Sequence, residues 1–304
     1  MVEPHISATL NDLQHNMKTK KYEKALPIAQ DMAVLRGESN DLYNLGLCFF
    51  HLNKLRDALA SLTRAISLDS NKANFWSSRG TVLLNLGGAK NLDDALSDFQ
   101  QAVKLDGSSH NLTGLGMALV KAQQYEEALL VLNRALKYRS TNEVALFFKG
   151  EAQDKLGHYA AALKIWRKLE KYGIGVTEVW AKMASTLIAM GHYQEALHYK
   201  IKSAEAFPDN ASIQSSVAAT ALLAREFALS LKFADEALES GYESVHLHLS
   251  RAQALIGLGN FAQGLAELEN TLPSLEESSG HEHFEGYVFG LLLTFYLVFE
   301  RDTQ

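Results

Sequence analysis

His281, Glu282 and His283 form the densest cluster of side chains in the sequence that could bind a metal ion. The cluster lies in a predicted linker, without the remaining ligands that a tetrahedral zinc site needs. Phosphate-binding glycine loops of the forms GxxxxGK[ST] and GxGxxG do not occur, and neither do the hydrolase motifs HExxH and GxSxG. The sequence therefore predicts no metal, no cofactor and no catalytic residue.

Cys48 is the single cysteine of the chain, and it lies next to Phe49 on a predicted apolar helix face. A chain with one cysteine forms no intrachain disulfide and no cysteine-rich zinc site. A thiol in apolar surroundings is normally buried and unreactive. We therefore interpret Cys48 as a core residue of a protein from a reducing compartment.

The charge balance and the apolar segments argue against two classes of protein. Lys and Arg number 29 against 35 Asp and Glu, a net charge of −6, whereas nucleic-acid-binding proteins usually carry a basic face. The longest uncharged apolar run, residues 286–299, has 14 residues, and spanning a bilayer takes about 20. Residues 1–5 have neither the basic stretch nor the apolar core of a secretory signal. We therefore expect a cytoplasmic protein that is not transmembrane.

The composition favours helices throughout. Leu and Ala, which cost little in a helix interior, supply 48 and 38 of the 304 residues, and only four residues are Pro. This composition predicts long runs of helix joined by short turns.

Three series of residues recur along the chain with a period of about 34 residues. One series of small residues is spaced by 34 or 36 residues: Gly46, Gly80, Gly116, Gly150, Ala184, Ala218 and Ala252. A second small-residue series contains Ala25, Ala58, Ala95, Ala128, Ala162, Ala196, Ser230 and Gly264. An aromatic series, each member 34 residues after the last, contains Tyr125, Tyr159, Tyr193, Phe227 and Phe261. One supersecondary unit is therefore repeated about eight times.

Each unit is predicted to contain two helices joined by a turn. In the second unit the apolar residues follow helical spacing on both sides of the polar pair Asn53-Lys54. Glycine followed by a polar residue marks the turn in later units, as in Gly157-His158. The small residues are expected where two helices cross, because only a short side chain lets the helix axes approach closely.

The pattern resembles the tetratricopeptide repeat family. The sixth unit carries the family motif at Trp180, Met183, Ala184, Leu187, Gly191, Tyr193, Ala196, Ala204 and Pro208. The resemblance implies an all-α, right-handed α-solenoid over residues 1–278, in which each repeat contacts mainly its neighbours. The predicted units are 6–38, 39–72, 73–108, 109–142, 143–176, 177–210, 211–244 and 245–278. Residues 281–304 are predicted to form an apolar capping helix and tail.

Two departures from the family pattern stand out. The third unit has about three extra residues around 88–90, which predict a longer turn between its helices. Cations replace the preferred Leu at Arg79, Lys149 and Arg251. In one interpretation their stems pack while their charged heads reach water. In the other they form a row of cations that faces a ligand.

The resemblance also implies that the first helix of each repeat lines a concave groove that binds peptide segments. The expected groove residues are Tyr43, Leu47, Phe50, His51, Asn74, Asn85, Met117, Lys121, Phe147, Glu151, Asp154 and Lys155. Leu10 and Gln14 occupy places where one subgroup of the family carries a clamp for acidic chaperone tails, so such a tail is not the expected ligand. The predicted groove is largely apolar and suits an amphipathic helix or an extended apolar segment.

Two functions fit these features. The first is a non-enzymatic scaffold, adaptor or assembly chaperone that binds a partner protein in the groove, unless tight curvature or the chain's own C-terminal helix covers it. The second is a self-assembling structural protein or a membrane-complex assembly factor that docks through Leu291, Phe295 and Phe299. An enzyme is not expected, because the repeats leave only about 25 C-terminal residues, too few for a catalytic domain.

Overall fold

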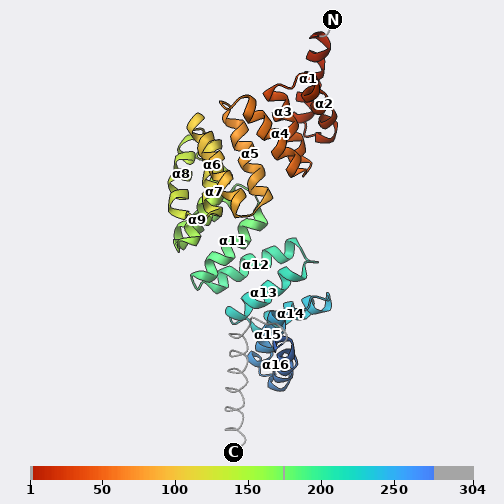
Figure 1. Cartoon of the computed structure of the whole chain (residues 1–304). Helices are drawn as coiled ribbons and strands as arrows, with labels where there is room; N and C mark the ends of the chain where they lie inside the picture. Colours follow the sequence, from red (N-terminus) through yellow and green to blue (C-terminus); the bar gives the residue numbers. More distant parts are fainter. Residues whose placement is uncertain (1–2, 174, 277–304) are drawn as a thin grey trace, which may run out of the picture. The chain divides into compact units, whose positions relative to one another are not determined.

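A computed structural model describes residues 3–173 and 175–276 of the chain. These residues form sixteen α-helices and no β-strand, arranged as successive helix-turn-helix pairs (Figure 1). The prediction of an all-α helical repeat solenoid is confirmed. The helix pairs are α1 (Glu3–Lys18) with α2 (Tyr22–Leu35), α3 (Ser39–His51) with α4 (Leu55–Leu68), α5 (Ala73–Leu86) with α6 (Ala89–Leu105), α7 (Ser109–Lys121) with α8 (Tyr125–Tyr138), α9 (Glu143–Lys155) with α10 (Tyr159–Lys171), α11 (Val176–Ala189) with α12 (Tyr193–Ala206), α13 (Ala211–Leu223) with α14 (Phe227–Glu239), and α15 (Val245–Gly257) with α16 (Phe261–Glu276).

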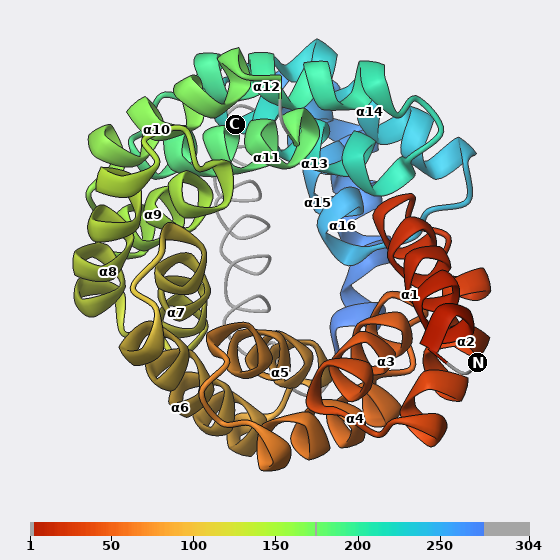
Figure 2. The same ribbon diagram turned by 90° about the horizontal axis from the view of Figure 1, so that it is seen from above.

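The chain divides into two compact units within α10, one ending at Ile165 and one starting at Trp166. In the first unit, α3, α5 and α7 lie on the inner side of the arc of helices, and α4, α6 and α8 lie on the outer side (Figure 2). In the second unit, α11 and α13 lie on the inner side of their own arc, and α12 and α14 lie outside (Figure 2). Each unit therefore exposes a face made of first helices.

Small residues let the paired helices of the first unit cross closely, as the sequence predicts. A Cβ atom on Gly46 would lie 2.7 Å from Leu62, and one on Gly116 would lie 2.5 Å from Leu132. Leu62 and Leu132 are fully buried, so neither side chain has space to retreat. These contacts hold α3 against α4 and α7 against α8 at a fixed separation.

Alanine-rich packing builds the core of the second unit. Ala218 on α13 packs with Ala234 and Ala237 on α14 and with Leu247 on α15, and all four side chains are fully buried. The buried hydroxyl of Ser230 donates a hydrogen bond to the Ala218 carbonyl oxygen at 2.8 Å, which satisfies its polar atom inside this core.

The turn within each pair requires a left-handed backbone at one position. Gly157, Gly191 and Gly259 occupy this position with positive φ angles of 76°, 76° and 84°. Non-glycine residues occupy it in other repeats: Lys20, Asn53, Gln123 and Arg225, with φ between 57° and 62°. A residue that has a side chain is strained in the left-handed conformation, whereas glycine is not.

The extra residues of the third unit lengthen a helix instead of a turn, so the predicted longer turn is wrong. Gly87 ends α5 with a φ of +71°, and Gly88, with a φ of +89°, directly precedes α6. The turn contains only these two residues, and α6 has 17 residues. The reason is that two left-handed glycines reverse the chain without a spacer, and the Asn91 amide fastens the turn by donating to the Gly87 carbonyl oxygen at 2.7 Å.

Within the part of the chain that the structure describes, no helix is long and apolar enough to cross a membrane. The predicted capping segment 281–304, with Leu291, Phe295 and Phe299, lies outside the described residues.

Candidate functional site

The predicted groove residues of the first unit lie on α3, α5, α7 and α9. The exposed members are all polar: His51, Asn74, Asn85, Lys121 and Lys155. The half-buried members are Tyr43, Leu47, Phe50, Met117, Phe147, Glu151 and Asp154. The surface is therefore more polar than the sequence predicts, because its apolar side chains turn toward neighbouring helices.

The aromatic side chains of this face pack within the repeat array. Tyr43 on α3 stacks on buried Phe75 of α5, with ring centroids 4.8 Å apart. His51 stacks on Tyr22 of α2 at 4.0 Å and meets Phe50 edge-on at 5.3 Å. Burial, together with the nearby Lys20 ammonium, lowers the pKa of His51 and favours the neutral ring. The Tyr43–Phe75 and Tyr22–His51 contacts stabilise the junctions between repeats.

A hollow of about 320 Å³, here called the central hollow, opens where α5, α7 and the start of α9 meet. Met117, Val144 and the ring of Phe99 provide its apolar lining, and His110 and Arg139 provide its basic groups. The complete lining is Thr81, Phe99, Ser109, His110, Thr113, Gly114, Met117, Arg139, Asn142 and Val144. No carboxylate belongs to this lining.

Asn142 fixes the rim of the central hollow. Its side-chain oxygen accepts a hydrogen bond from the Ala145 backbone N–H at 3.1 Å and caps α9. Its amide group donates to the Ser109 and Thr113 hydroxyl oxygens of α7 at 3.1 and 2.9 Å. One side chain thus starts α9 and ties it to α7, so the rim is held in place before any ligand arrives.

A second hollow of about 410 Å³, here called the turn hollow, lies at the other end of α7. Its lining is Leu83, Leu84, Gly87, Gly88, Ala89, Leu92 and Lys121. Of these lining residues, Lys121 is the one that the sequence places on the predicted groove. Arg139, Asn142 and the Gly87-Gly88 turn were missed because they lie between helices, outside the first-helix positions of the family pattern. The inserted glycine pair was the signal that could have found the turn hollow.

The two arginines at Leu positions of the repeat do not form a row of cations facing a ligand, so that interpretation is wrong. Arg79 on α5 donates to both carboxylate oxygens of buried Asp98 on α6, at 2.8 and 2.7 Å. Arg251 on α15 donates to Asp235 on α14 and to Glu267 on α16, at 2.6 and 2.7 Å. The third cation of this set, Lys149, is half-buried and also has an interaction partner. The heads of both arginines therefore hold helices together instead of reaching water.

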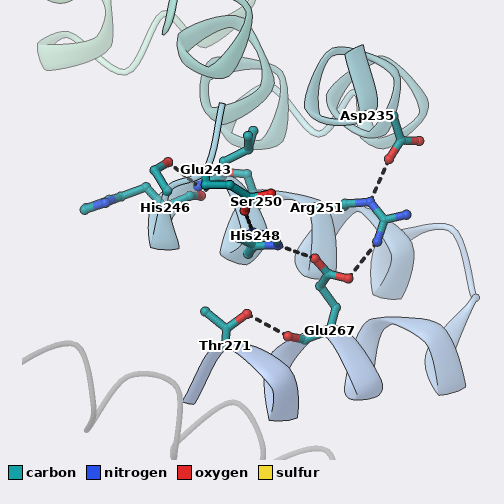
Figure 3. Close-up of polar contacts among 10 residues, drawn as sticks. Asp235, Glu243, His246, His248, Ser250, Arg251, Glu267 and Thr271 are labelled. Atoms are coloured by element: carbon teal, nitrogen blue, oxygen red, sulfur yellow. Dashed lines mark hydrogen bonds and ion pairs between the residues drawn. The ribbon is translucent and has the colours of Figure 1, made fainter. Parts of the chain in front are cut away.

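His248 continues the network around Arg251. Its Nδ1 lies 2.6 Å from Glu267 and its Nε2 lies 2.6 Å from Glu243, so both nitrogens face carboxylates. Figure 3 shows Glu267 between His248 and Arg251, with Arg251 reaching on to Asp235. Burial lowers the pKa of His248, but the hydrogen bonds to Glu267 and Glu243 outweigh it and raise the pKa above its usual value. The imidazole links α15 to α16 and to the turn before α15.

Cys48 has the surroundings of an unreactive core thiol. Cys48 is fully buried, and burial raises the pKa of its thiol to about 11. Among the described residues, no group of three or more His, Cys, Asp or Glu side chains could hold a metal ion. His281, Glu282 and His283 lie outside the described residues.

Two family models match parts of the sequence. The model described as "Tetratricopeptide repeat" matches residues 43–110. The model described as "Anaphase-promoting complex, cyclosome, subunit 3" matches residues 121–203. Together these matches cover most of the stretch from α3 to α12. The chain belongs to the tetratricopeptide repeat (TPR) family.

Solved structures share the fold of this TPR protein. A chain in the crystal structure of the APC/C hetero-tetramer Cut9–Hcn1 matches 80% of the TPR protein with a TM-score of 0.65 and 14% identity. The match covers 48% of that chain, so the TPR protein spans about half its length. A tetratricopeptide repeat protein from Parabacteroides merdae matches 82% of the TPR protein and is itself covered to 98%, with a TM-score of 0.59 and 16% identity. No curated protein matches the sequence. The TPR fold suggests a scaffold for protein–protein interactions.

Proposed function

We propose that this TPR protein is a cytoplasmic, non-enzymatic adaptor or assembly chaperone that holds a segment of a partner protein on the inner face of its first unit. The observation that carries the proposal is the pair of hollows along α7, the central hollow at its start and the turn hollow at its end. Ligand sites are concave and combine an apolar lining with a few fixed polar groups. The central hollow has both, in Met117 and Phe99 and in the side chains around Asn142.

The binding mechanism follows from the rigidity of this surface. Phe99 is almost fully buried, and Leu115 and Leu119 on α7 lie in the same core cluster. Hydrogen bonds from Asn142 hold the rim. A partner side chain that enters the central hollow therefore loses its own freedom but orders little of the TPR protein, which favours affinity. The exposed His110 and Arg139 supply donors for polar groups of the partner.

Val144 offers a test that leaves the core intact. It lines the central hollow and is 52% exposed, so Val144→Glu adds a charge to the hollow without unfolding the repeat. Val34→Glu is the matched control, because Val34 is exposed on α2 and lines neither hollow. Phe50→Ala and Phe147→Ala are less suited, because these half-buried rings also contact the neighbouring rings of His51 and Phe148.

The measurement is a quantitative crosslinking pull-down from the native host with the full chain and with each variant. We expect Val144→Glu to reduce recovery of the partner by about tenfold or more, which corresponds to about 1.4 kcal/mol of binding free energy. Val34→Glu should recover the partner like the unmodified chain, and circular dichroism should be the same for all three proteins. Equal recovery by Val144→Glu and Val34→Glu would falsify the proposed site.

A further inference from the structure

The turn hollow is a product of the residues inserted in the third unit. Leu83 and Leu84 on α5 and Leu92 on α6 supply its apolar lining. Gly87 and Gly88 present no side chain, and Ala89 presents only a methyl group, so backbone and small groups form the rest of the wall. At about 410 Å³ the hollow lies within the range of roughly 300–1,000 Å³ that is usual for ligand sites. The added turn of α6 therefore gives this repeat an apolar recess.

The lining of the turn hollow carries a net positive charge. Lys121 is its only charged lining residue, and among the described residues it forms no ion pair. The first turn of α6 contains no acidic side chain, whereas α4 and α8 begin with acidic residues. The partial positive charge of that helix end is therefore not offset by an acidic side chain in its first turn.

We propose that the turn hollow binds a large apolar side chain from an acidic segment of a partner protein. The apolar side chain enters the recess, and a neighbouring Asp or Glu of the partner pairs with Lys121 and faces the start of α6. Charge complementarity decides the class of partner: the lining contains one cation and no anion, so a basic segment is repelled and an uncharged one gains no ion pair. This proposal rests on the proposed function and names the chemistry of the segment that the inner face binds.

The position of the two hollows on α7 sets the spacing of the partner's side chains. Met117 lines the central hollow and Lys121 lines the turn hollow, four residues later on the same helix. His110, at the far end of the central hollow, lies eleven residues before Lys121. At a rise of about 1.5 Å per residue these separations are about 6 and 16 Å. An extended chain advances about 3.3 Å per residue, so about two to five residues bridge the hollows.

The test is selection from a library of random peptides displayed on phage, with the immobilised full chain as the target. We expect enriched sequences to contain Asp or Glu next to Leu, Ile, Phe or Met. The selected peptides are then synthesised, and their affinities are measured for the unmodified chain and for four variants. Lys121→Glu reverses the charge at the rim, and Ala89→Trp fills the recess from an exposed helix start. Lys137→Glu and Ala160→Trp make the same changes at exposed positions on α8 and α10, outside both hollows.

The outcomes separate this inference from the proposed function. Weakening of binding by about tenfold or more in Lys121→Glu and Ala89→Trp, with little change in the two control variants, would support the turn hollow. If the peptides bind Lys121→Glu and Ala89→Trp with the same affinity as the unmodified chain, the inference is overturned. The proposed function is still supported in that case if Val144→Glu recovers less of the partner in the pull-down. Enrichment of basic or uncharged peptides, or no enrichment over a bare surface, would also overturn the inference. The pull-down with Val144→Glu tests the proposed function separately.

Discussion

Arg79 and Asp98 join the two helices of one repeat through a pair of hydrogen bonds, from Nε to Oδ2 at 2.8 Å and from Nη2 to Oδ1 at 2.7 Å. Asp98 is 2% exposed, and the guanidinium lies over the ring of Trp76 at 5.1 Å from its centroid. Burial raises the pKa of the Asp98 carboxyl above its usual value, although the hydrogen bonds from Arg79 oppose this rise. Arg79 therefore supplies the cation that compensates this carboxylate in the core.

Removing Arg79 should destabilise the first unit strongly. Arg79→Met leaves the Asp98 carboxylate buried without a cation, a change that typically costs about 3–5 kcal/mol. Arg79→Met combined with Asp98→Leu should recover most of this loss, because no buried charge then remains. Urea unfolding followed by circular dichroism measures both effects.

Arg167→Met is the control for this comparison. Arg167 pairs with Glu195, but its side chain is 54% exposed, so its loss should cost less than about 1 kcal/mol. If Arg79→Met and Arg167→Met shift the unfolding midpoint equally, the Arg79–Asp98 pair is not a buried, stabilising contact.

The fold could be predicted from the sequence because the repeat fixes the helix crossings. The periodic spacing of Gly46 and Gly116 indicates a close helix crossing, and each glycine does face a buried leucine of the second helix. The ion pairs could not be predicted from the arginines alone, because an arginine at a Leu position does not indicate which carboxylate it pairs with. A signal existed, however. Asp98 and Glu267 each lie three residues after the small residues Ala95 and Gly264 of the second repeated series.

The two hollows could not be predicted from the repeat pattern, for a different reason. Repeat periodicity locates the residues that recur, and the central hollow depends on Asn142 and Arg139, which lie between helices. The turn hollow depends on where an insertion is absorbed, in a turn or in a helix. That choice follows from the backbone angles of Gly87 and Gly88, both left-handed, which the sequence allows but does not require.

Gly114→Ala should destabilise the first unit and alter the central hollow. An added Cβ would lie 2.4 Å from Phe99, and the opposite edge of the same ring lies 2.9 Å from the place of a Cβ on Gly80. The ring has no room to move away, so we expect a cost of about 1–3 kcal/mol. Thermal unfolding followed by circular dichroism measures it.

Gly107→Ala is the matched control, because the nearest atom to its added Cβ is 3.9 Å away. Its unfolding temperature should equal that of the unmodified chain or lie slightly above it, because alanine reduces the freedom of the unfolded chain. An equally small effect of Gly114→Ala would contradict the tight packing of Phe99 between α5 and α7.

Gln123→Gly should stabilise the protein. Gln123 has a φ of 61° at the turn position where Gly157 stands in the next repeat. Glycine relieves the left-handed strain, against a smaller loss from the greater freedom of the unfolded chain, so the gain should be roughly 0.5–1 kcal/mol. Gly157→Ala should lose about 1 kcal/mol for the converse reason. Gln124→Gly is the control, because Gln124 has a φ of −89° and therefore no left-handed strain to relieve, so this variant should not stabilise the protein. The midpoints of urea unfolding compare the three variants.

The network around His248 should make the last described helix pair less stable as the pH rises. Glu243, Glu267 and, through Glu267, Arg251 face the imidazole, and the pKa of His248 lies above its usual value of 6.5 in the folded protein. Its stabilisation is therefore fully present below about pH 6.5 and is lost as the pH rises through the folded-state pKa. Hydrogen exchange of α15 and α16, corrected for the intrinsic rate at each pH, should show less protection at about pH 8 than at about pH 6. His248→Gln should remove most of this difference, while His192→Gln, at an exposed turn, should keep it. An unchanged pH dependence in His248→Gln would assign the effect to another group.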